Sequence, residues 1–348
     1  MNLEIGFMTK DLNLEDIARL SGVSRSTVSR VINNQEYVSP KTREKVLEVI
    51  RKHGYQPNLA ARALVSQRSK VIGILIPHDV SDLFTDPFFP TLLEGITLTS
   101  NQMGYGVTLW LTTTKTDHPN FYASAFNNSL IDGLVIASAT FTDSFLGWLR
   151  QFPKPFAFVG AAPESMMDTI YVDIDNIGGG ELAVNHLLEQ GCQRIGMIEG
   201  RSEQVASIAR TKGYIRALEK AGIPIDQNLI IPNGNYTEVG GYHGMGALLD
   251  QGVDGVFAAN DMIAIGALRA IREAGLEVPH DIAVIGFDDI SFAAMAHPPL
   301  STIRQPITMI GAETTRELIE YLEQDEPEIQ NVVLPVELVV RESSVKVK

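Results

Sequence analysis

The sequence of 348 residues has almost no cysteine and no long hydrophobic run, and each absence excludes a class of protein. The single cysteine, Cys192, rules out an intramolecular disulfide and a cysteine-built zinc site, as is typical of a reducing cytoplasm. No apolar stretch approaches the roughly 18 residues of a membrane-spanning helix. Residues 1–10 also lack the basic region, apolar stretch and cleavage site of a secretory signal. We therefore expect a cytoplasmic protein that makes no membrane contact.

The motifs of common enzyme active sites are missing as well. The sequence contains no GxSxG nucleophile elbow, no HExxH zinc motif and no GxxxxGK[ST] phosphate loop. The glycines at 178–180 have neither the lysine nor the GxGxxG spacing that phosphate binding needs. His78 with Asp79 and Asp82 fits a solvated loop better than a metal site. These absences predict a protein that is not an enzyme and that holds no cofactor or metal.

Charge is distributed unevenly along the chain. Hydrophobic residues are 45%, charged residues 20% and the mean hydropathy is +0.05, as in an ordinary globular protein. The net charge of −14 argues against DNA binding, because affinity for DNA comes from Lys and Arg. However, residues 1–70 contain 12 Lys and Arg against 7 Asp and Glu, whereas the remaining 278 contain 16 against 35. Net charges of +5 and −19 indicate a basic nucleic-acid-binding module on an acidic body.

The basic segment is predicted to form three short helices. Asn13, Ser24 and Ser39 are suitable N-cap residues, and Ser39 is followed by a proline at the first helical position. Gly22 and Gly54 permit the turns that end the first and third helices, and the second continues to about residue 33. Two short helices at a glycine-containing turn are typical of the helix-turn-helix motif, whose second helix enters the major groove of DNA.

The second of these helices has one polar face. If Val28, Val31 and Ile32 pack inward, the outward face comprises Arg25, Ser26, Ser29 and Arg30. Arginine donates a bidentate pair to guanine, and serine donates or accepts, so these are residue types that read bases. The flanking hydroxyls suit contacts with phosphate: Ser24, Thr27, Ser39 and Thr42. Spacing alone also allows a solvated helix face that contacts no DNA.

Residues 57–68 (PNLAARALVSQR) follow as a linker. Pro57 can begin a helix, but so short a helix is unstable alone in water, so we expect it to be ordered only by a partner. Leu64 has two interpretations that the pattern does not separate. Its side chain can wedge between base steps in a minor groove, or it can pack on a neighbouring domain.

From residue 71 onward, short apolar runs alternate with longer amphipathic ones. Runs of strand length occur at 71–76, 106–111, 133–137, 156–159, 194–198, 255–258 and 282–286. This alternation is typical of parallel sheets covered by helices on both faces. About 270 residues is long for one such sheet, so we expect two doubly wound lobes with a cleft between them. Ligands of such folds bind beyond the carboxyl ends of the strands.

The residues that follow three of these runs are carboxylates, amides and aromatics: Asp86, Phe88, Phe89, Asn260, Asp261, Phe287, Asp288 and Asp289. Such groups suit a polyhydroxyl ligand, because hydroxyls accept and donate hydrogen bonds while rings stack, and sugars fit this description. Each aspartate also fits the N-cap of the following helix. Arg210 and Tyr236 show no relation to these residues by pattern alone.

Several motifs in one order resemble the lactose repressor / galactose repressor (LacI/GalR) family of bacterial transcription regulators. The DNA-binding segment carries LEDIARLSGVSRSTVSRVIN at 14–33, VSPKTREKV at 38–46 and GYQPNLAARAL at 54–64. The body carries DPFFPTLLEGI at 86–96, RTKGY at 210–214, ANDMIAIGALRAI at 259–271, IGFDD at 285–289 and STIRQP at 301–306. The resemblance covers about residues 13–341.

The resemblance implies a fold and a division into domains. We expect an all-α helix-turn-helix domain over 13–56 and a hinge over 57–69, followed by an α/β two-lobed, periplasmic-binding-protein-like effector domain over 70–341. The first lobe would comprise 70–172 and 301–328, and the second 173–300 and 329–341. The chain would therefore cross between the lobes near Asp173, Leu300 and Ile329.

The resemblance also implies roles for single residues. Arg25, Ser26 and Arg30 match base-reading positions, the four hydroxyl residues named above match phosphate contacts, and the hinge would reach the minor groove through Asn58, Ala61 and Leu64. In the body, Arg210 and Asp288 match the pair that grips the effector. Further effector contacts match Asp86, Phe88, Phe89, Tyr236 and Asn260. Asp86 replaces the family's asparagine in a longer loop, which leaves that side of the site in question.

The function implied is a transcription regulator, most simply a repressor, that binds pseudo-palindromic double-stranded operator DNA as a homodimer. Effector binding, most simply of a saccharide, would favour one lobe orientation and so set operator affinity, with either sign. No tetramerising heptad tail follows Arg341. Two alternatives stay open: a sugar-binding protein or two-lobed enzyme without DNA function, and a regulator whose effector is a purine or a sugar phosphate.

Overall fold

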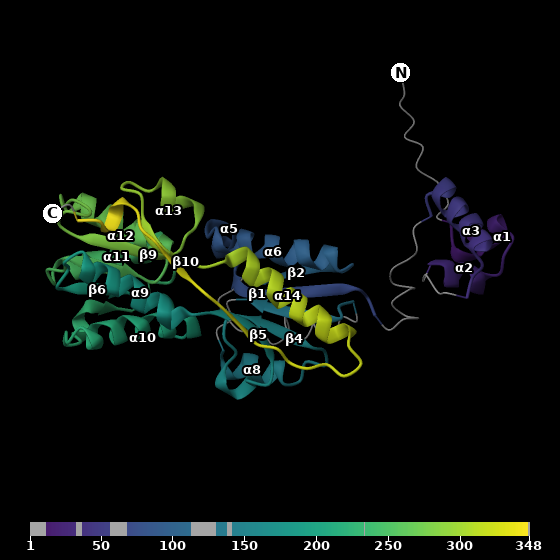
Figure 1. The fold of residues 1–348 in the computed structure, drawn as a ribbon, viewed down its shortest axis with the longest axis horizontal. Helices are drawn as coiled ribbons and strands as arrows, with labels where there is room; N and C mark the ends of the chain where they lie inside the picture. The colour runs from purple at the N-terminus through teal and green to yellow at the C-terminus, as the bar shows by residue number, and fades with distance from the viewer. Residues whose placement is uncertain are drawn as a thin grey trace, which may run out of the picture. The chain divides into compact units, whose positions relative to one another are not determined.

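The computed structural model describes residues 12–32, 37–55, 68–112, 130–137, 141–232 and 234–346, without the side chains of 77–82 and 112. The chain divides between Ser69 and Lys70 into two compact units (Figure 1). The predicted linker helix, with Asn58, Ala61 and Leu64, lies outside the described residues. Within the described part, no helix is long and apolar enough to cross a membrane.

The first unit contains the three predicted helices: α1 (Leu14–Ser21), α2 (Arg25–Ile32) and α3 (Pro40–His53). Asn13 and Asp16 form a reciprocal capping box at the start of α1, and Gly22 ends it in the left-handed region at φ +61°. Ser39 caps α3 by accepting from the backbone N–H of Thr42. The helices are held by a small core of Ile17, Ala18, Val28, Val31, Val46 and Tyr55. The helix-turn-helix prediction is confirmed.

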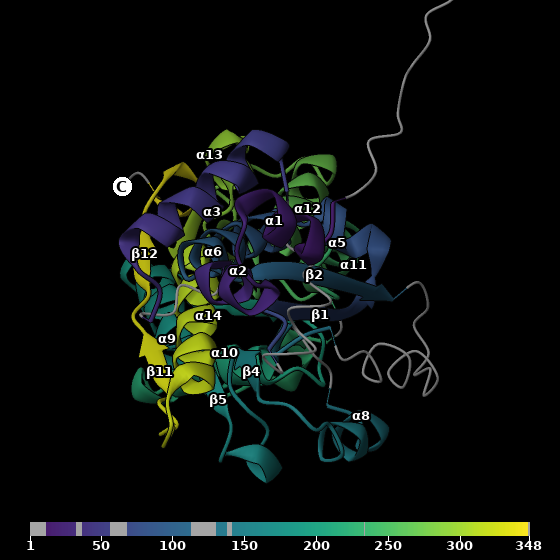
Figure 2. The ribbon, with the colours of Figure 1, turned by 90° about the vertical axis from the view of Figure 1, so that its right-hand side faces the viewer.

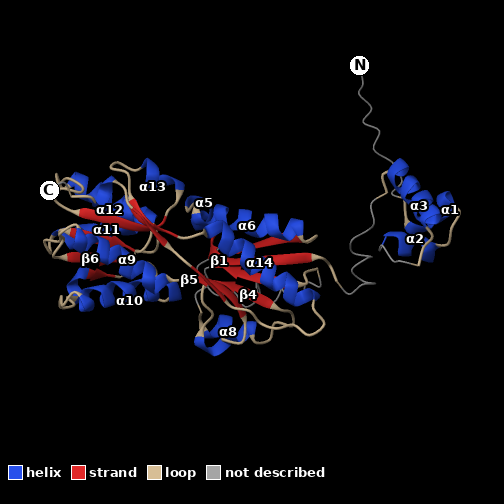
Figure 3. Ribbon diagram, viewed as in Figure 1, coloured by secondary structure: helices blue, strands red, loops and turns tan. Residues whose placement is uncertain are grey.

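The second unit contains two sheets. The first consists, in spatial order, of β11 (Val332–Leu334), β5 (Ile170–Ile174), β4 (Phe156–Val159), β3 (Gly133–Ala137), β1 (Val71–Asp79) and β2 (Gly106–Thr112). The second consists of β12 (Glu337–Val339), β10 (Ser301–Arg304), β9 (Ala283–Asp288), β8 (Gly255–Ala258), β6 (Ile195–Ile198) and β7 (Ile230–Ile231). All these pairings are parallel except that of β12 with β10. The predicted two-lobed architecture is confirmed (Figure 3).

Helices cover both faces of each sheet, which explains why the central strands are buried throughout. In the first lobe these are α5 (Val80–Thr85), α6 (Phe88–Gln102), α8 (Asp143–Leu149) and α14 (Ile307–Glu323). In the second lobe they are α9 (Asn176–Glu189), α10 (Val205–Lys220), α11 (Glu238–Leu249), α12 (Asp261–Glu273) and α13 (Ser291–Met295). Short 3-10 turns lie at Glu164–Met166, Gln227–Leu229 and Glu342–Ser344. Helices α6 and α14 pack side by side on one face of the first sheet (Figures 1 and 2).

The strand pairing corrects two predicted lobe boundaries. We expected residues 301–304 in the first lobe, but β10 pairs with β9 in the second sheet. We expected the chain to return to the second lobe near Ile329, but β11 pairs with β5 in the first sheet. These two crossings therefore lie at 305–306 and 335–336. Strands this short, with polar or exposed side chains, have no hydrophobic pattern that assigns them to a sheet, so only backbone pairing reveals their lobe.

The sequence did not predict β5, β7, β10, β11 or β12. The apolar residues of β5 and β7 were overlooked, whereas β10, β11 and β12 lack a continuous apolar run of strand length. In β10, Ser301 and Thr302 are fully buried polar residues whose hydroxyls are bonded within the second lobe. A buried polar strand does not read as an apolar run. The segment expected as a loop around His78 and Asp82 is instead the end of β1 followed by α5. Leu83 of α5 is buried against the first lobe, as expected for one face of an amphipathic helix.

Candidate effector site and DNA-reading helix

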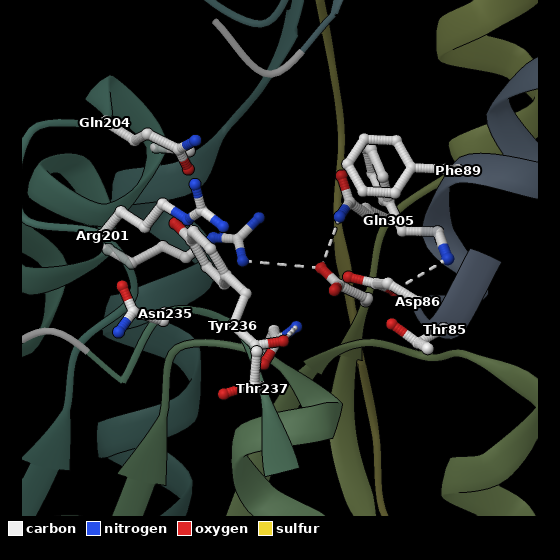
Figure 4. Close-up of a pocket in the computed structure, with 14 residues that line it drawn as sticks. Thr85, Asp86, Phe89, Arg201, Gln204, Asn235, Tyr236, Thr237 and Gln305 are labelled. Carbon is white, nitrogen blue, oxygen red and sulfur yellow. Dashed lines mark hydrogen bonds and ion pairs between the residues drawn. The ribbon is translucent and has the colours of Figure 1, made fainter. Parts of the chain in front are cut away.

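The seven residues matched to effector contacts all line one cleft at the carboxyl ends of the strands, between the two lobes (Figure 4). The cleft encloses about 660 Å³, part of it open to solvent. From the first lobe come Asp86, Phe88 and Phe89, and from the second Arg210, Tyr236, Asn260 and Asp288. The sequence missed seven other residues that line it: Thr85, Arg201, Gln204, Ala206, Asn235, Thr237 and Gln305. Figure 4 shows Asp86 and Phe89 facing Arg201, Gln204 and Tyr236.

Arg210 is held rigidly before any ligand binds. Its Nε donates to Asn176 Oδ1 at 2.9 Å and its Nη1 donates to the Ala259 carbonyl at 2.6 Å. Its guanidinium lies 3.6 Å from the centre of the Phe287 ring, a cation–π contact. The side chain is only 6% exposed. A cation fixed in this way offers its remaining N–H groups to a ligand at little cost in conformational entropy.

Glycines bring the helix that carries Arg210 close to its neighbour. A Cβ on Gly180 of α9 would lie 2.5 Å from the Arg210 carbonyl, and one on Gly213 of α10 would lie 2.3 Å from the Ile177 carbonyl. Only glycine permits backbones to approach this closely. Of the glycines at 178–180, Gly180 therefore serves helix packing and the placement of Arg210, whereas Gly179 lies against the Phe287 ring and Gly178 beside the capping Asp175 side chain.

Asp288 is the acidic partner of Arg210. Its Oδ1 lies 3.5 Å from Arg210 Nη1 and also accepts from Gln305 Nε2. Burial raises the pKa of Asp288 to about 7; Arg210 opposes this rise and Asp86 adds to it. Its φ of +113° is unusual for a residue other than glycine, and such strain is found most often at functional sites. The carboxylate is placed to accept hydrogen bonds from ligand hydroxyls.

Of the neighbouring carboxylates, two have structural roles. Asp261 is fully buried and accepts from the Thr302 hydroxyl at 2.6 Å and the Ile290 N–H at 2.9 Å, so it neither lines the cleft nor caps α12. Burial, with repulsion from Asp288, raises the pKa of Asp261 well above its usual value. Asp289 is paired with Arg304 and Arg341. The N-cap interpretation of Asp261 and Asp289 is therefore wrong.

Two cleft residues combine a structural contact with exposure to the ligand space. Asn260 is the actual N-cap of α12, because its Oδ1 accepts from the Ile263 N–H at 2.9 Å. Asp86 accepts from the Phe88 N–H at 2.9 Å at the start of α6. Both side chains also line the cleft. The sequence allowed two roles for Asp86, helix N-terminus or ligand, and its position is compatible with both together.

Tyr236 forms one wall of the cleft. A Cβ on Gly200 would lie 2.1 Å from Tyr236 Cζ, so the ring requires glycine at that position. Its backbone has a φ of +59°, and burial of the hydroxyl raises the pKa of Tyr236. Across the cleft, Phe88 and Phe89 meet edge to face with ring centres 5.4 Å apart. Aromatic rings on both walls suit a flat or ring-shaped ligand.

A second chamber of about 690 Å³ adjoins the first on the side of the first sheet. It shares the residues Phe88, Gln204, Ala206, Arg210 and Gln305 with the first chamber. Its remaining wall is mainly apolar: Ile136, Phe141, Phe158, Val159, Val172, Ile174, Val205 and Ile310. Phe141 and Phe158 meet edge to face at 5.2 Å. No local pattern indicates this chamber, because its residues come from separate segments that the fold brings together.

The DNA-reading candidates lie on the exposed side of α2. Arg25, Ser26 and Arg30 are exposed and Ser29 is half-buried, while Val28 and Val31 on the opposite side are buried. Arg25 Nη1 lies 3.6 Å from Glu15 Oε1. Spacing placed these side chains correctly because helix geometry alone determines which residues share a face.

The candidate phosphate contacts lie at two helix N-termini. Ser24 and Ser39 accept from the N–H groups of Thr27 and Thr42, respectively. The hydroxyls of each pair are 2.8 Å apart. Exposed N–H groups and the helix dipole make such a terminus favourable for an anion such as phosphate. The hinge candidates lie outside the described residues, so the DNA side of the site rests on this helical unit.

Known proteins share both parts of this architecture. The family described as bacterial regulatory proteins, lacI family, matches residues 13–58, and a periplasmic binding protein-like domain matches residues 184–344. The HTH-type transcriptional regulator CelR of Thermobifida fusca is 37% identical over 335 residues, which are 95% of this chain and 97% of CelR. A CelR–cellobiose complex covers 95% of this chain and 99% of its own at 35% identity, with a TM-score of 0.75.

A structure of the lac repressor dimer bound to operator and the anti-inducer ONPF is also similar. It covers 97% of this chain and 100% of its own, at 27% identity and a TM-score of 0.82. The similarity therefore spans the helical unit and both lobes. The identity with CelR extends over nearly the full length of both chains and is high enough to establish family membership. The chain belongs to the lacI family of bacterial regulatory proteins.

Proposed function

We propose that this protein is a transcriptional repressor that binds operator DNA as a homodimer and releases or tightens that binding when a saccharide occupies the interlobe cleft. Membership of the lacI family makes it a DNA-binding transcription regulator. In this proposal, residues 13–56 read DNA, 57–69 form the hinge and the remainder binds effector and dimerises. The protein acts in the cytoplasm and catalyses no reaction.

The observation that carries the saccharide assignment is the fixed Arg210–Asp288 pair at the floor of a cleft lined by polar side chains. Each sugar hydroxyl needs both a donor and an acceptor, and Arg210 and Asp288 provide one of each, already oriented by protein hydrogen bonds. Tyr236 and Phe88 supply ring faces for the apolar face of a pyranose. The CelR–cellobiose complex supports the same ligand class.

The second chamber indicates the size of the saccharide. It meets the polar chamber at Arg210 and Gln305, so a ligand gripped there can extend into it. A second pyranose ring has an apolar face that suits Phe141 and Phe158. We therefore propose a disaccharide in preference to a monosaccharide.

A purine effector is the second candidate, because Phe88, Phe89 and Tyr236 would also stack on a base. A sugar phosphate is a further candidate, since Arg201 and Arg210 line the same cleft beside Asp86 and Asp288. With any of these effectors, the protein remains a DNA-binding regulator. A sugar-binding protein without DNA function is the remaining alternative.

A thermal-shift panel with cellobiose, glucose, a purine base and a sugar phosphate tests the effector class. A ligand at about 100 times its Kd should stabilise the folded state by about 2.7 kcal/mol. With all ligands at the same concentration, we expect the largest shift with cellobiose, a smaller one with glucose, and none with either in an Arg210→Ala variant. A shift with the purine alone would overturn the saccharide assignment.

A second experiment tests the DNA function. The full chain is used to select a duplex from a random pool, and binding to that duplex is measured at two salt concentrations with and without cellobiose. We expect a pseudo-palindromic site and strong weakening by salt, because Lys and Arg displace counterions from DNA. No sequence-selective complex would support the non-DNA alternative.

A further inference from the structure

Lys70 is the first residue of the two-lobed unit and is fixed from three sides. Its backbone N–H donates to Asp132 Oδ2 at 2.8 Å, its carbonyl accepts from the Gly106 N–H at 2.8 Å, and its Nζ bonds Glu323. Its backbone φ is +55°, a value that residues other than glycine rarely adopt. Such a conformation persists only where surrounding contacts determine it. The point at which residues 57–69 join the body therefore has a defined direction.

The Nζ of Lys70 lies at the carboxyl ends of two long helices. Glu323 is the last residue of α14, and Tyr105 follows the end of α6. The Tyr105 hydroxyl donates to Glu323 Oε1 at 3.3 Å, and Lys70 Nζ lies 4.4 Å from the centre of the Tyr105 ring. Lys70 and Glu323 are nearly half exposed, so this ion pair adds little to stability. Its consequence is geometric, because it ties Lys70 to α6 and α14.

The opposite ends of the same two helices reach the effector cleft. Helix α6 begins at Phe88, which lines both chambers, and Asp86 accepts from the N–H of Phe88. Helix α14 is preceded by Gln305, whose Nε2 donates to Asp288. The 17 residues of α14 span about 25 Å at 1.5 Å per residue. One pair of helices thus connects the ligand-gripping carboxylate to Lys70.

The two helices are packed too closely to slide freely. A Cβ on Gly95 of α6 would lie 2.0 Å from the Thr308 carbonyl, and one on Gly311 of α14 would lie 2.5 Å from the Leu92 carbonyl. Backbones in direct contact transmit displacement because close-packed interiors are hardly compressible. A shift of either helix at the cleft therefore moves both at the Lys70 end.

We propose that Lys70, Tyr105 and Glu323 are positioning residues that couple effector occupancy to the DNA-binding unit, with α6 and α14 as the rigid connection. The inference rests on the proposed function. Effector contact with Phe88 and Asp288 displaces the amino-terminal ends of α6 and α14. Lys70, Tyr105 and Glu323, at the other ends, turn this displacement into a change of chain direction at Lys70. The DNA-binding unit responds because the proposed hinge, residues 57–69, ends at this junction.

The coupling is measured as the ratio of Kd values for the selected duplex with and without cellobiose. Allosteric couplings of this kind are typically about 5- to 150-fold. We expect the ratio to fall below about threefold in Lys70→Met and in Glu323→Gln, with the Kd for cellobiose changed by less than about twofold. Lys70→Arg, which keeps the charge, should retain the wild-type ratio. The control is Lys220→Met, which breaks another Lys–Glu pair, in the second lobe, and should change nothing.

A double-mutant cycle tests the same connection without any effector. Gln305→Ala and Lys70→Met are made singly and together, and the Kd for the duplex is measured for each full-length variant. Coupled residues should give a combined effect that differs from the product of the single effects by more than about threefold, whereas independent sites agree within about twofold.

Wild-type ratios in Lys70→Met and Glu323→Gln, or effects of Gln305→Ala and Lys70→Met that multiply independently, would overturn the inference while leaving the proposed function intact. Loss of cellobiose binding in Lys70→Met would also overturn it, because the cluster would then support the cleft itself. A wild-type chain that selects no duplex would instead overturn the proposed function and the inference with it.

Discussion

The exposed face of α2 and the interlobe cleft place the same residue type in opposite environments. The side chain of Arg25 on α2 is 70% exposed, whereas that of Arg210 on α10 is 6% exposed and bonded to two fixed acceptors. In the helical unit, the exposed side chains of α2 are not part of the small hydrophobic core. In the body, the proposed ligand-binding groups Arg210, Asn260 and Asp288 are themselves buried. Recognition and stability are therefore separable in the first unit and linked in the second.

Arg210→Ala should give the largest combined effect. It removes the guanidinium partner of Asp288, Asn176 Oδ1 and the Ala259 carbonyl, which should lower the free energy of unfolding by roughly 3 kcal/mol and abolish the response to cellobiose. Denaturant unfolding and the DNA titration measure both. Arg216→Ala, on the same helix but 55% exposed, is the control and should cost less than about 0.5 kcal/mol. Unchanged stability in Arg210→Ala would remove the link between recognition and stability.

Arg30→Ala tests the opposite behaviour in the helical unit. We expect it to lose roughly 1 to 3 kcal/mol of discrimination at one operator position, with unfolding unchanged, because the side chain is exposed and outside the core. Competition binding with single-base variants of the duplex measures this. Arg51→Ala, in the last turn of α3, is the control for loss of charge alone. An equal loss on every duplex would make Arg30 a phosphate contact instead.

Asn13→Ala tests whether the helical unit unfolds independently of the body. Loss of the capping box should destabilise this unit by about 1 kcal/mol, since Asn13 accepts from the N–H groups of Glu15 and Asp16. Asn13→Ser keeps a capping oxygen and should restore most of the loss. Hydrogen exchange of amides in α1 and in β9 compares the units. A matching change in β9 would show that they unfold together.

The smallest expected effect is a pH dependence in the body. Because burial raises the pKa of Asp288 to about 7, the folded state binds a proton more tightly than the unfolded state there. This group therefore adds stability at low pH that is lost as the pH rises toward about 7. Cellobiose affinity should follow the opposite course, since the ionised carboxylate accepts hydroxyl protons more strongly.

If only the ionised form binds, affinity should increase at most about tenfold between about pH 6 and about pH 8. Calorimetric titration across this range measures the change. Asp288→Asn should bind more weakly and show no pH dependence, while DNA binding by the exposed α2 face should be indifferent to this substitution in the absence of effector. A pH profile that persists in Asp288→Asn would assign the titration to another group.

The sequence predicted features that depend on neighbours along the chain. The helix ends at Asn13, Gly22, Ser39 and Gly54 follow from capping chemistry, and the outward face of α2 follows from helix geometry. Strands that are buried throughout, such as β3 and β8, were predicted because burial on both faces requires a continuous apolar run. The position of Asp288 at a strand end marked it as a cleft residue.

Other features depend on which segments meet in space. Gln305 donates to Asp288, β10 lies in the second sheet, and β11 lies in the first sheet. None of these has a local signal, since a short strand or a single amide has no periodicity. Gly95 and Gly311 likewise gain meaning only when α6 and α14 lie against each other.

By itself, then, the sequence determined the three helices of the basic unit, the alternation of strands and helices in the acidic body, and the chemical types at the strand ends. Local spacing suffices for these because caps, helix faces and strand burial are set within a few residues. Only the tertiary structure decided that Arg210, Asp288 and Phe88 share one cleft, that a second chamber adjoins it, and that two helices connect it to Lys70. Such contacts arise from burial and backbone pairing between distant segments, which no local pattern encodes.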